Sequence, residues 1–196
     1  KEHGVPATFF VVGREVEQYP DIARRIVAEG HEIGNHTYSH ANLLGARPQT
    51  VEHEIIAANR AIEAVTGVRP HFFRPPRGVY TAKVLEVVRD QDQRVILYSL
   101  SSHDWLELSP RDIAQGVLRR VRPGDILLLH DSGDLIRNHS GDRSNTLRAL
   151  PLIIEGLKER GYTLLTVGEL LILSHLEMEG EEFERIEQEA GVPYPP

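Results

Sequence analysis

Two histidines, His36 and His40, stand four residues apart in the run Gly-Asn-His-Thr-Tyr-Ser-His. Neutral imidazoles at this spacing can face one metal ion, because residues i and i+4 share one side of a helical turn. Two histidines completed by carboxylate or water are a common build of catalytic zinc centres that keep one position open. Taken alone, the pair favours an interpretation as surface or capping histidines, since such short motifs often match by chance. The segments that follow decide between the two interpretations.

Three further segments place chemically active side chains directly after a candidate strand. Arg74 opens the run Arg-Pro-Pro-Arg-Gly, Asp104 and Trp105 close the run Ser-Ser-His-Asp-Trp, and His130 ends the run Leu-Leu-Leu-His. In parallel α/β folds the active site lies at the carboxyl ends of the strands, so these groups would meet at one edge. We therefore expect a catalytic site there, with His130 as its acid or base.

Each of these residues also has a structural interpretation. Arg74 can pair with a surface carboxylate, although the two prolines after it stiffen the chain. Trp105 is the only tryptophan, and a sugar-stacking role in its polar loop competes with packing in the core. His130 can be a buried histidine whose ring is satisfied by a backbone carbonyl. The alignment of all of them at strand ends favours the functional interpretation.

The elements that would position these residues alternate between short β-rich runs and longer amphipathic stretches. The predicted strands are Ala7–Val12, His31–Asn35, His71–Arg74, Val95–Leu100, Asp125–His130 and Thr163–Val167. The predicted helices cover residues 15–29, 48–66, 81–92, 109–121 and 145–160, and another begins near Gly168. Ser109 before Pro110 predicts a helix cap, as does Ser144 or Asn145. Predicted helix ends coincide with glycines at positions 30, 67, 124 and 161.

The fold class follows from this order. The apolar run Ile126–Leu129 is typical of a parallel strand covered on both faces. Repeated β–α units predict a parallel α/β fold, either a barrel or an open sheet. Six units are too few for an ordinary eight-stranded barrel, and a unit ahead of Lys1 would supply part of the deficit.

Composition sets further bounds. The 196 residues are 40% hydrophobic and predict one domain over residues 1–175. Residues 177–196 hold seven glutamates and one arginine, a net −6 of the total −7, so we expect an acidic helix or tail over 176–196. The body therefore gives no reason to expect nucleic acid or an anionic membrane as partner. There is no cysteine, and no apolar run suggests a membrane span or signal peptide.

Taken in order, the motifs resemble those of polysaccharide deacetylases of the NodB-homology type, carbohydrate esterase family 4. His-Thr-Tyr-Ser-His matches the metal-binding motif, Arg-Pro-Pro-Arg-Gly the groove motif, Ser-Ser-His-Asp-Trp the motif that ends in Asp-Trp, and Leu-Leu-His the Leu-x-His motif. The segments Pro6–Val11 and Gly141–Thr146 also fit, so the resemblance covers roughly residues 5–170.

The resemblance implies a distorted (β/α) barrel that removes N- or O-acetyl groups from a polysaccharide with a divalent metal, zinc by preference and cobalt or nickel as alternatives. It implies that His36 and His40 bind the metal and that Asp104 orients His130 as general acid. Arg74 would hold the catalytic aspartate, and the backbone N–H of Arg77 would stabilise the oxyanion. The residues implied to contact the acetylated sugar are Trp105, Leu128 and Pro76.

The chain departs from the family pattern in three places. The Thr-Phe-Asp-Asp-Gly-Pro motif, whose aspartates are the general base and the third metal ligand, has no counterpart in the sequence. We expect this motif, with the first βα unit, to lie upstream of Lys1. Ser101 stands where many members carry an aspartate, and Arg77 replaces the usual tyrosine. The second replacement adds a positive charge to the groove and removes an aromatic wall.

These departures leave alternatives open. A degenerate relative could bind glycans without turning them over, and a metal-free relative could cleave an amide or imide, although both metal histidines are retained. Peptidoglycan N-acetylglucosamine or N-acetylmuramic acid, chitin oligomers and acetylxylan are all possible substrates of this fold. For a bacterial wall-polymer deacetylase we expect an extracellular or cell-wall-associated location.

Overall fold

The computed structural model describes residues 2–106, 108–132 and 142–176. Its strands are β1 (Thr8–Val11), β2 (Glu32–Asn35), β3 (Phe72–Phe73), β4 (Arg94–Val95), β5 (Leu100–Ser101) and β6 (Leu127–Leu128). The first four form one sheet in chain order, and β5 pairs with β6 in a second. Every pairing is parallel. The predicted parallel α/β fold is confirmed.

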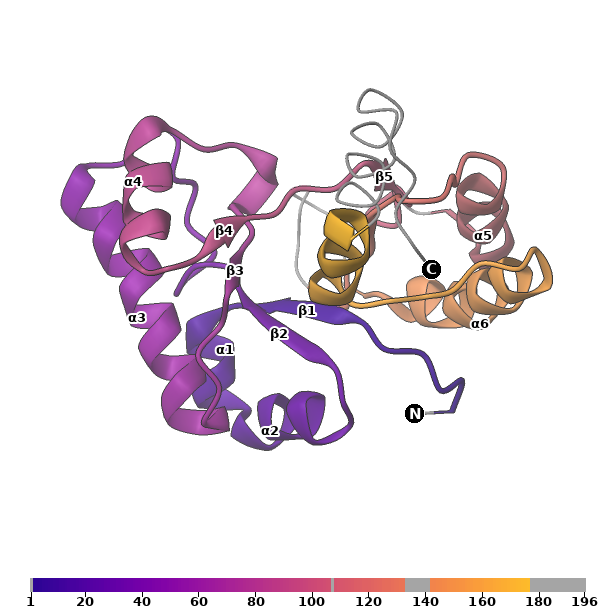
Figure 1. Ribbon diagram of the computed structural model, residues 1–196, viewed down its shortest axis with the longest axis horizontal. Helices are drawn as coiled ribbons and strands as arrows, with labels where there is room; N and C mark the ends of the chain where they lie inside the picture. Colours follow the sequence, from indigo (N-terminus) through magenta and orange to yellow (C-terminus); the bar gives the residue numbers. More distant parts are fainter. Residues whose placement is uncertain (1, 107, 133–141, 177–196) are drawn as a thin grey trace, which may run out of the picture.

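Helices connect the strands and cover the sheets (Figure 1). They are α1 (Gly13–Gln18), α2 (Pro20–Ala28), α3 (Pro48–Thr66), the short 3₁₀ turn η1 (Pro76–Gly78), α4 (Ala82–Asp90), α5 (Pro110–Leu118) and α6 (Ser144–Glu159). A further helix covers residues 167–176. In Figure 1 the helices α1 to α4 gather around the four-stranded sheet, and α5 and α6 lie together on the other side of the molecule.

Each of these two parts has its own hydrophobic core. Buried side chains of α3, β3, α4 and the loop between β2 and α3 form one cluster, comprising Leu43, Val51, Ile55, Phe73, Val84, Val87 and Val88. Buried side chains of β5, α5 and α6 form another, comprising Leu100, Ile113, Ala114, Val117, Ala149, Ile153 and Leu157. These packed helices hold the strand ends in place, and so they position the loops that follow the strands.

One predicted helix is divided in the structure. The stretch expected to be helical over residues 15–29 forms α1 and α2, with Tyr19 between them at φ −127° and ψ 60°. Pro20 has no N–H to continue a helical ladder, disfavours helical dihedrals in the residue before it, and suits the first position of a new helix. The prediction of a single helix is therefore wrong, and the proline is the reason.

Two predicted strands also differ. The strand expected over Val95–Leu100 ends at Val95 in β4 and resumes at Leu100 in β5, so this segment crosses between the sheets. The Arg74 side chain donates to the carbonyl oxygens of Ile96 and Leu97, which a neighbouring strand would otherwise use.

The strand expected over Thr163–Val167 does not form. The end of this segment caps the helix over residues 167–176. Thr166 and Glu169 each donate a backbone N–H to the other's side chain there, which forms a capping box. Two residues of β1 and β2 also reach this helix start. Val167 N–H donates to Thr8 Oγ1 at 2.8 Å, and Gly168 N–H donates to Glu32 Oε2 at 3.1 Å.

Predicted helix ends are mostly confirmed. Asp112 N–H donates to Ser109 Oγ at 3.2 Å, so Ser109 caps α5 as expected. The glycines at positions 30, 67, 124 and 161 all have positive φ, which a side chain would oppose. At α6 the cap position is Arg143 and not Ser144 or Asn145; Asp142 Oδ1 accepts from Ser144 N–H at 2.9 Å.

The structure also bears on the ends and surface of the chain. No helix within the described ranges is long and apolar enough to cross a membrane. Of the acidic segment expected over residues 176–196, all but the first residue lies outside the described residues.

Candidate active site

The loop after β2 brings His36 and His40 together, with ring centroids 4.9 Å apart. The spacing alone suggested a helical turn, but the loop is not helical. Instead, Thr37 and His40 adopt left-handed dihedrals, with φ of 67° and 61°. Residues other than glycine adopt this conformation only where their surroundings hold them. The proximity of the two imidazoles therefore depends on contacts outside the motif.

The start of α1 provides part of that support. Gly13 N–H donates to Thr37 O at 3.0 Å, and Arg14 N–H donates to Tyr38 O at 2.9 Å. A Cβ atom on Gly13 would lie 2.9 Å from the Cα atom of Ala58 in α3, closer than real contacts allow. Glycine is thus required here for α1 to approach both the loop and α3 closely.

The ring of His36 is oriented by the backbone carbonyl of Arg74, which directly follows β3. Its Nδ1 lies 2.6 Å from Arg74 O, and because a carbonyl can only accept, Nδ1 carries the proton. Nε2 is left as the ligand atom, an arrangement common among metal-binding histidines. Burial lowers the pKa of His36 to about 4. Burial also lowers the pKa of His40, and the charge of Arg77 adds to the effect. Both rings are therefore neutral at pH 7, as metal ligands must be.

Arg74 is a partly buried cation at the end of β3. Its Nε donates to Ile96 O at 3.3 Å, one Nη donates to Leu97 O at 2.9 Å, and its guanidinium carbon lies 4.0 Å from the centre of the Phe10 ring. Burial lowers the pKa of Arg74 to about 10. Among the described residues it forms no ion pair with a carboxylate. The guanidinium keeps donors for a further acceptor.

The turn η1 follows Arg74 and places Pro76 in the interior while Arg77 is exposed. Arg77 has φ 61° and ψ 9°, left-handed values that distort the turn from helical geometry. Arg77 also contributes to the lowered pKa of His40, so its charge acts on the loop after β2.

On the second sheet, Asp104 and His130 form a buried, oriented pair. Asp104 Oδ1 lies 2.8 Å from His130 Nδ1, and Asp104 Oδ2 accepts from the His130 backbone N–H at 2.7 Å. The Asp104 side chain is fully buried and that of His130 is 22% exposed. Burial opposes the charge on Asp104, but the hydrogen bonds from His130 outweigh it and hold the pKa of the carboxyl below its usual range. The Nε2 atom of His130 is left for a substrate.

A residue that sequence reasoning missed completes this pair. Thr146, near the start of α6, donates through its hydroxyl to Asp104 Oδ2 at 3.1 Å. Thr146 belongs to the segment that resembles the family, but no role was assigned to it there. Its signal is a hydroxyl at a buried position of an amphipathic helix, with 6% of its surface exposed.

Aromatic and apolar residues surround His130. Trp105 meets its ring edge-on, with centroids 5.4 Å apart and planes at 87°. Leu128 is buried on β6, two residues before His130. His103, to which sequence reasoning gave no role, also contacts the tryptophan, with ring centroids 5.3 Å apart. The partly exposed indole of Trp105 therefore contacts two imidazoles.

The two sets of residues interact electrostatically. The charge of His130 is among the causes that lower the pKa of both His36 and His40. In the part of the chain that the structure describes, no group of three or more His, Cys, Asp or Glu side chains could hold a metal ion. Within that part, His36 and His40 are two imidazoles that lie against each other.

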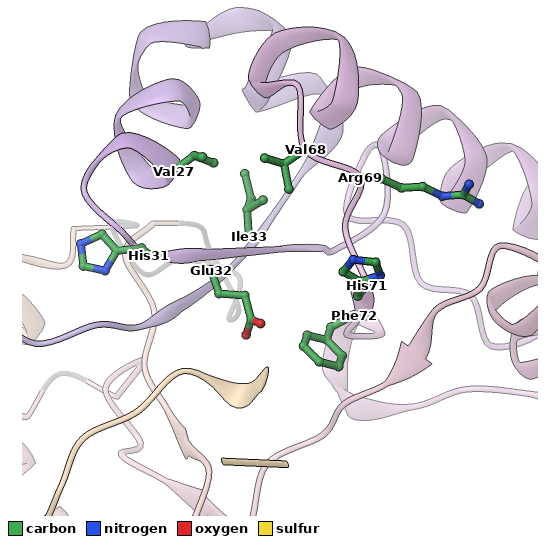
Figure 2. Close-up of a pocket in the computed structure, with 8 residues that line it drawn as sticks. All are labelled: Val27, His31, Glu32, Ile33, Val68, Arg69, His71 and Phe72. Carbon is green, nitrogen blue, oxygen red and sulfur yellow. The ribbon is translucent and has the colours of Figure 1, made fainter. Parts of the chain in front are cut away.

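A cavity of about 290 Å³ lies at the opposite edge of the sheet (Figure 2). It opens at the amino ends of β2 and β3, and it is lined by Val27, His31, Glu32, Ile33, Val68, Arg69, His71 and Phe72. Its one carboxylate, on Glu32, already accepts from Thr8 and Gly168. In Figure 2 the side chains of Arg69 and His31 point away from each other, so the charged groups do not converge as those of the strand-end site do.

Comparison with known proteins agrees with this geometry. The sequence model of polysaccharide deacetylases matches residues 1–96. A chitooligosaccharide deacetylase of Bradyrhizobium sp. (strain ANU 289) is 37% identical over 174 residues, which cover 86% of this chain and 80% of the relative. The chain belongs to the polysaccharide deacetylase family. The resemblance seen in the motifs and the NodB-type α/β fold are both confirmed.

Two further relatives show the range of this family. A peptidoglycan-N-acetylglucosamine deacetylase of Bacillus cereus is 34% identical over 167 residues, covering 85% of this chain and 58% of the relative. The crystal structure of a carbohydrate esterase family 4 pseudoenzyme from Bacillus anthracis is 33% identical, with a TM-score of 0.78 over 87% of this chain and 57% of that one. The chain thus spans somewhat more than half of each. A mutant of the same pseudoenzyme has restored enzymatic activity.

Proposed function

We propose that this chain is a metal-dependent hydrolase that removes acetyl groups, N-acetyl in the first place, from a polysaccharide such as peptidoglycan or chitin oligomers. The observation that carries the proposal is an oriented Asp104–His130 pair whose charge acts on the adjacent imidazoles of His36 and His40. The deacetylase relatives support the same chemistry.

The two imidazoles are suited to a divalent metal, which we take to be zinc, with cobalt or nickel as alternatives. Both rings are neutral at pH 7, and the Nδ1 proton of His36 is fixed by Arg74 O. When bound, such a metal polarises the acetyl carbonyl and activates water. The general acid, the oxyanion donor and the sugar contacts fall to groups of this chain, whereas the family's aspartate base has no counterpart in this sequence.

His130 acts as general acid. Its Nδ1 is held by Asp104, so Nε2 delivers a proton to the leaving amine as the carbon–nitrogen bond breaks. Asp104 orients the ring, because one carboxylate oxygen binds Nδ1 and the other accepts from the His130 backbone N–H. Thr146 keeps the carboxylate in place.

The other residues bind and orient. The backbone N–H of Arg77, on its left-handed turn, stabilises negative charge on the acetyl oxygen. Trp105, Leu128 and Pro76 form the wall against which the acetylated sugar rests. Arg74 holds the carboxylate that serves as general base, which is the role its unused donors fit.

A second function has a specific observation in its favour. No third metal ligand stands beside His36 and His40 among the described residues, and one similar structure is that of a pseudoenzyme. A chain that binds glycans without cleaving them would have these features. We favour hydrolysis because the Asp104–His130 pair, which glycan binding alone does not need, is intact.

Acetate release tests the proposal. The chain is incubated with N-acetylated chitooligosaccharides, with peptidoglycan and with acetylxylan, with zinc and after treatment with a chelator. We expect zinc-dependent acetate release from at least one N-acetylated polymer, lost on chelation and recovered on adding zinc. Binding of the glycan without acetate under any of these conditions would support the glycan-binding alternative. We also propose an extracellular or cell-wall-associated location, which the relative named as a peptidoglycan-N-acetylglucosamine deacetylase supports.

A further inference from the structure

Helix α3 carries buried polar side chains within an otherwise apolar face. Its buried residues are Val51, Glu54, Ile55, Ala58, Asn59, Ala61 and Ile62. Glu54 and Asn59 each expose 6% of their surface. A carboxylate at such a position is unfavourable unless its oxygens are hydrogen-bonded. The hydrogen-bond partners of Glu54 and Asn59 therefore indicate which part of the structure these side chains hold.

Glu54 binds the loop that carries the two histidines. Its Oε2 accepts from the Ser39 backbone N–H at 2.8 Å, and its Oε1 accepts from the Ser39 hydroxyl at 2.7 Å. Within the described ranges Glu54 forms no ion pair. Both carboxylate oxygens of the buried Glu54 thus bind Ser39, and no cation among the described residues pairs with the negative charge of Glu54.

Ser39 directly precedes His40, whose backbone is left-handed with φ 61°. Two bonds to a rigid helix fix the position of Ser39, and with it the direction in which the chain enters His40. The side chain of His40 lies against that of His36, with ring centroids 4.9 Å apart. Releasing Ser39 would let His40 relax to an ordinary conformation and turn its ring away from His36.

Asn59 holds the other end of the same loop through Asn35. Asn35 Nδ2 donates to Asn59 Oδ1 at 2.6 Å, and Asn35 Oδ1 accepts from Thr37 N–H at 2.7 Å. Asn59 is in turn bonded to Gln93 at 3.1 Å. One face of α3 therefore holds the loop just before His36 and just before His40.

We propose that Glu54 is a positioning residue for metal binding, and this inference rests on the proposed function. Its hydrogen bonds to Ser39 hold His40 beside His36, and its uncompensated negative charge favours a cation bound to the loop. Sequence reasoning did not identify Glu54, although a carboxylate at an apolar position of an amphipathic helix was a usable signal.

The test separates hydrogen bonding from charge. E54L removes both, whereas E54Q removes the charge but can still accept from the Ser39 N–H and donate to its hydroxyl oxygen. E63L and E63Q are matched controls, because Glu63 is an exposed glutamate on the same helix. Two quantities are measured on the full chain: zinc affinity by calorimetry, and amide hydrogen exchange at Ser39.

We expect E54L to lose exchange protection at Ser39 and to weaken zinc binding by about 10–100-fold, the range for loss of a group that orients a ligand. E54Q should keep the protection and weaken zinc binding by less than E54L does. E63L and E63Q should leave both quantities unchanged. Retained protection and retained zinc affinity in E54L would overturn the proposal.

Two outcomes need separate treatment. If E54L does not fold, S39A decides the question, because it removes the hydroxyl bond alone; zinc affinity should fall, and unchanged affinity would overturn the proposal. If the unmodified chain binds no zinc, the proposed function fails independently of Glu54. Amide exchange at Ser39 then still tests the role of Glu54. If Glu54 holds the loop, protection is lost in E54L and kept in E54Q; if the loop is held without Glu54, E54L keeps the protection.

Discussion

The half of the site built on β5 and β6 and the half built on β1 to β4 treat their charged groups differently. On β5 and β6 the buried carboxylate of Asp104 is matched by His130 at 2.8 Å and by the Thr146 hydroxyl at 3.1 Å. On the four-stranded sheet the partly buried cation of Arg74 has two carbonyls and the Phe10 ring as partners, and no carboxylate among the described residues.

The comparison indicates which chemistry each half can perform. The Asp104–His130 half holds an imidazole oriented by a buried, fully hydrogen-bonded carboxylate, which suits the proposed general acid. The His36–His40 half holds two adjacent imidazoles beside a cation that has donors to spare, which suits the proposed metal site. A carboxylate near Arg74 would satisfy that cation and add the acidic group that the metal half lacks. We therefore expect variants in the two halves to give different losses.

The largest effect should come from removing a metal ligand. His36→Ala deletes one of two imidazoles, and we expect zinc affinity to fall by more than the roughly 100-fold that loss of a group orienting a metal ligand costs. Acetate release should fall with it. Calorimetric titration with zinc measures the first and an acetate assay the second.

The control for this variant is His71→Ala, which removes an exposed imidazole at the cavity on the opposite edge of the sheet. H71A should bind zinc as the unmodified chain does. Equal losses in the two variants would mean that His36 does not belong to the metal site.

Asp104→Asn should disrupt the Asp104–His130 half of the site and leave the His36–His40 half intact. The carboxylate accepts from the His130 ring, the His130 backbone and Thr146, whereas the amide of asparagine offers a single oxygen for these three donors. We expect kcat to fall by about 10²–10⁴-fold, the usual worth of a positioned acid, with zinc affinity unchanged. Steady-state kinetics at saturating zinc measure the effect. A matching fall in zinc affinity would contradict the separation of the two halves.

Part of the candidate site could be predicted from the sequence. The spacing of His36 and His40 correctly predicted their proximity but not its cause, because the left-handed Thr37 and His40 depend on contacts with Glu54 and Gly13. The Asp104–His130 contact was expected from the family motifs, and the distance supports it.

Other features needed the folded chain. The strand expected over Val95–Leu100 is interrupted where the Arg74 side chain takes the carbonyls of Ile96 and Leu97, a contact between residues more than twenty positions apart. From helices α6 and α3, Thr146 and Glu54 bind residues 42 and 15 positions away, so the sequence does not show which residues they contact. Long-range side-chain contacts of this kind leave no periodic pattern.

A smaller effect is expected from Gly13→Ala, which tests how α1 supports the half of the site that contains His36 and His40. The added Cβ would meet the Cα atom of Ala58 at 2.9 Å and the Tyr38 ring at 2.8 Å, so α1 must move away from the loop. We expect a loss of about 1–3 kcal/mol in the free energy of unfolding, as for other overpacked sites, and weaker zinc binding. Denaturant unfolding and calorimetry provide the two values.

Gly116→Ala is the matched control, because a Cβ in that part of α5 would meet nothing closer than Arg120 at 3.9 Å. This replacement should stabilise the chain by about 0.5–1 kcal/mol and leave zinc binding alone. If G13A behaved like G116A, the close approach of α1 would not matter to the site.

The smallest effect concerns substrate choice. Arg77 is exposed, and its charge should favour glycans that carry a carboxylate, such as those with N-acetylmuramic acid, over neutral chitooligosaccharides. An exposed ion pair is worth about 0.2–1 kcal/mol, so Arg77→Tyr should lower the preference for the anionic substrate by about 1.5–5-fold. The ratio of kcat/KM values for the two substrates measures it. An unchanged ratio would mean that this charge does not reach the substrate.

The most direct test of one site built from two halves is acetate release by His130→Ala at the same zinc occupancy as the unmodified chain. If His130 is the general acid, the variant binds zinc with nearly unchanged affinity but releases acetate about 10²–10⁴-fold more slowly. Equal loss of zinc binding and turnover would show that the role of His130 is wrong. Equal acetate release by the two proteins would show that the Asp104–His130 half takes no part in the reaction.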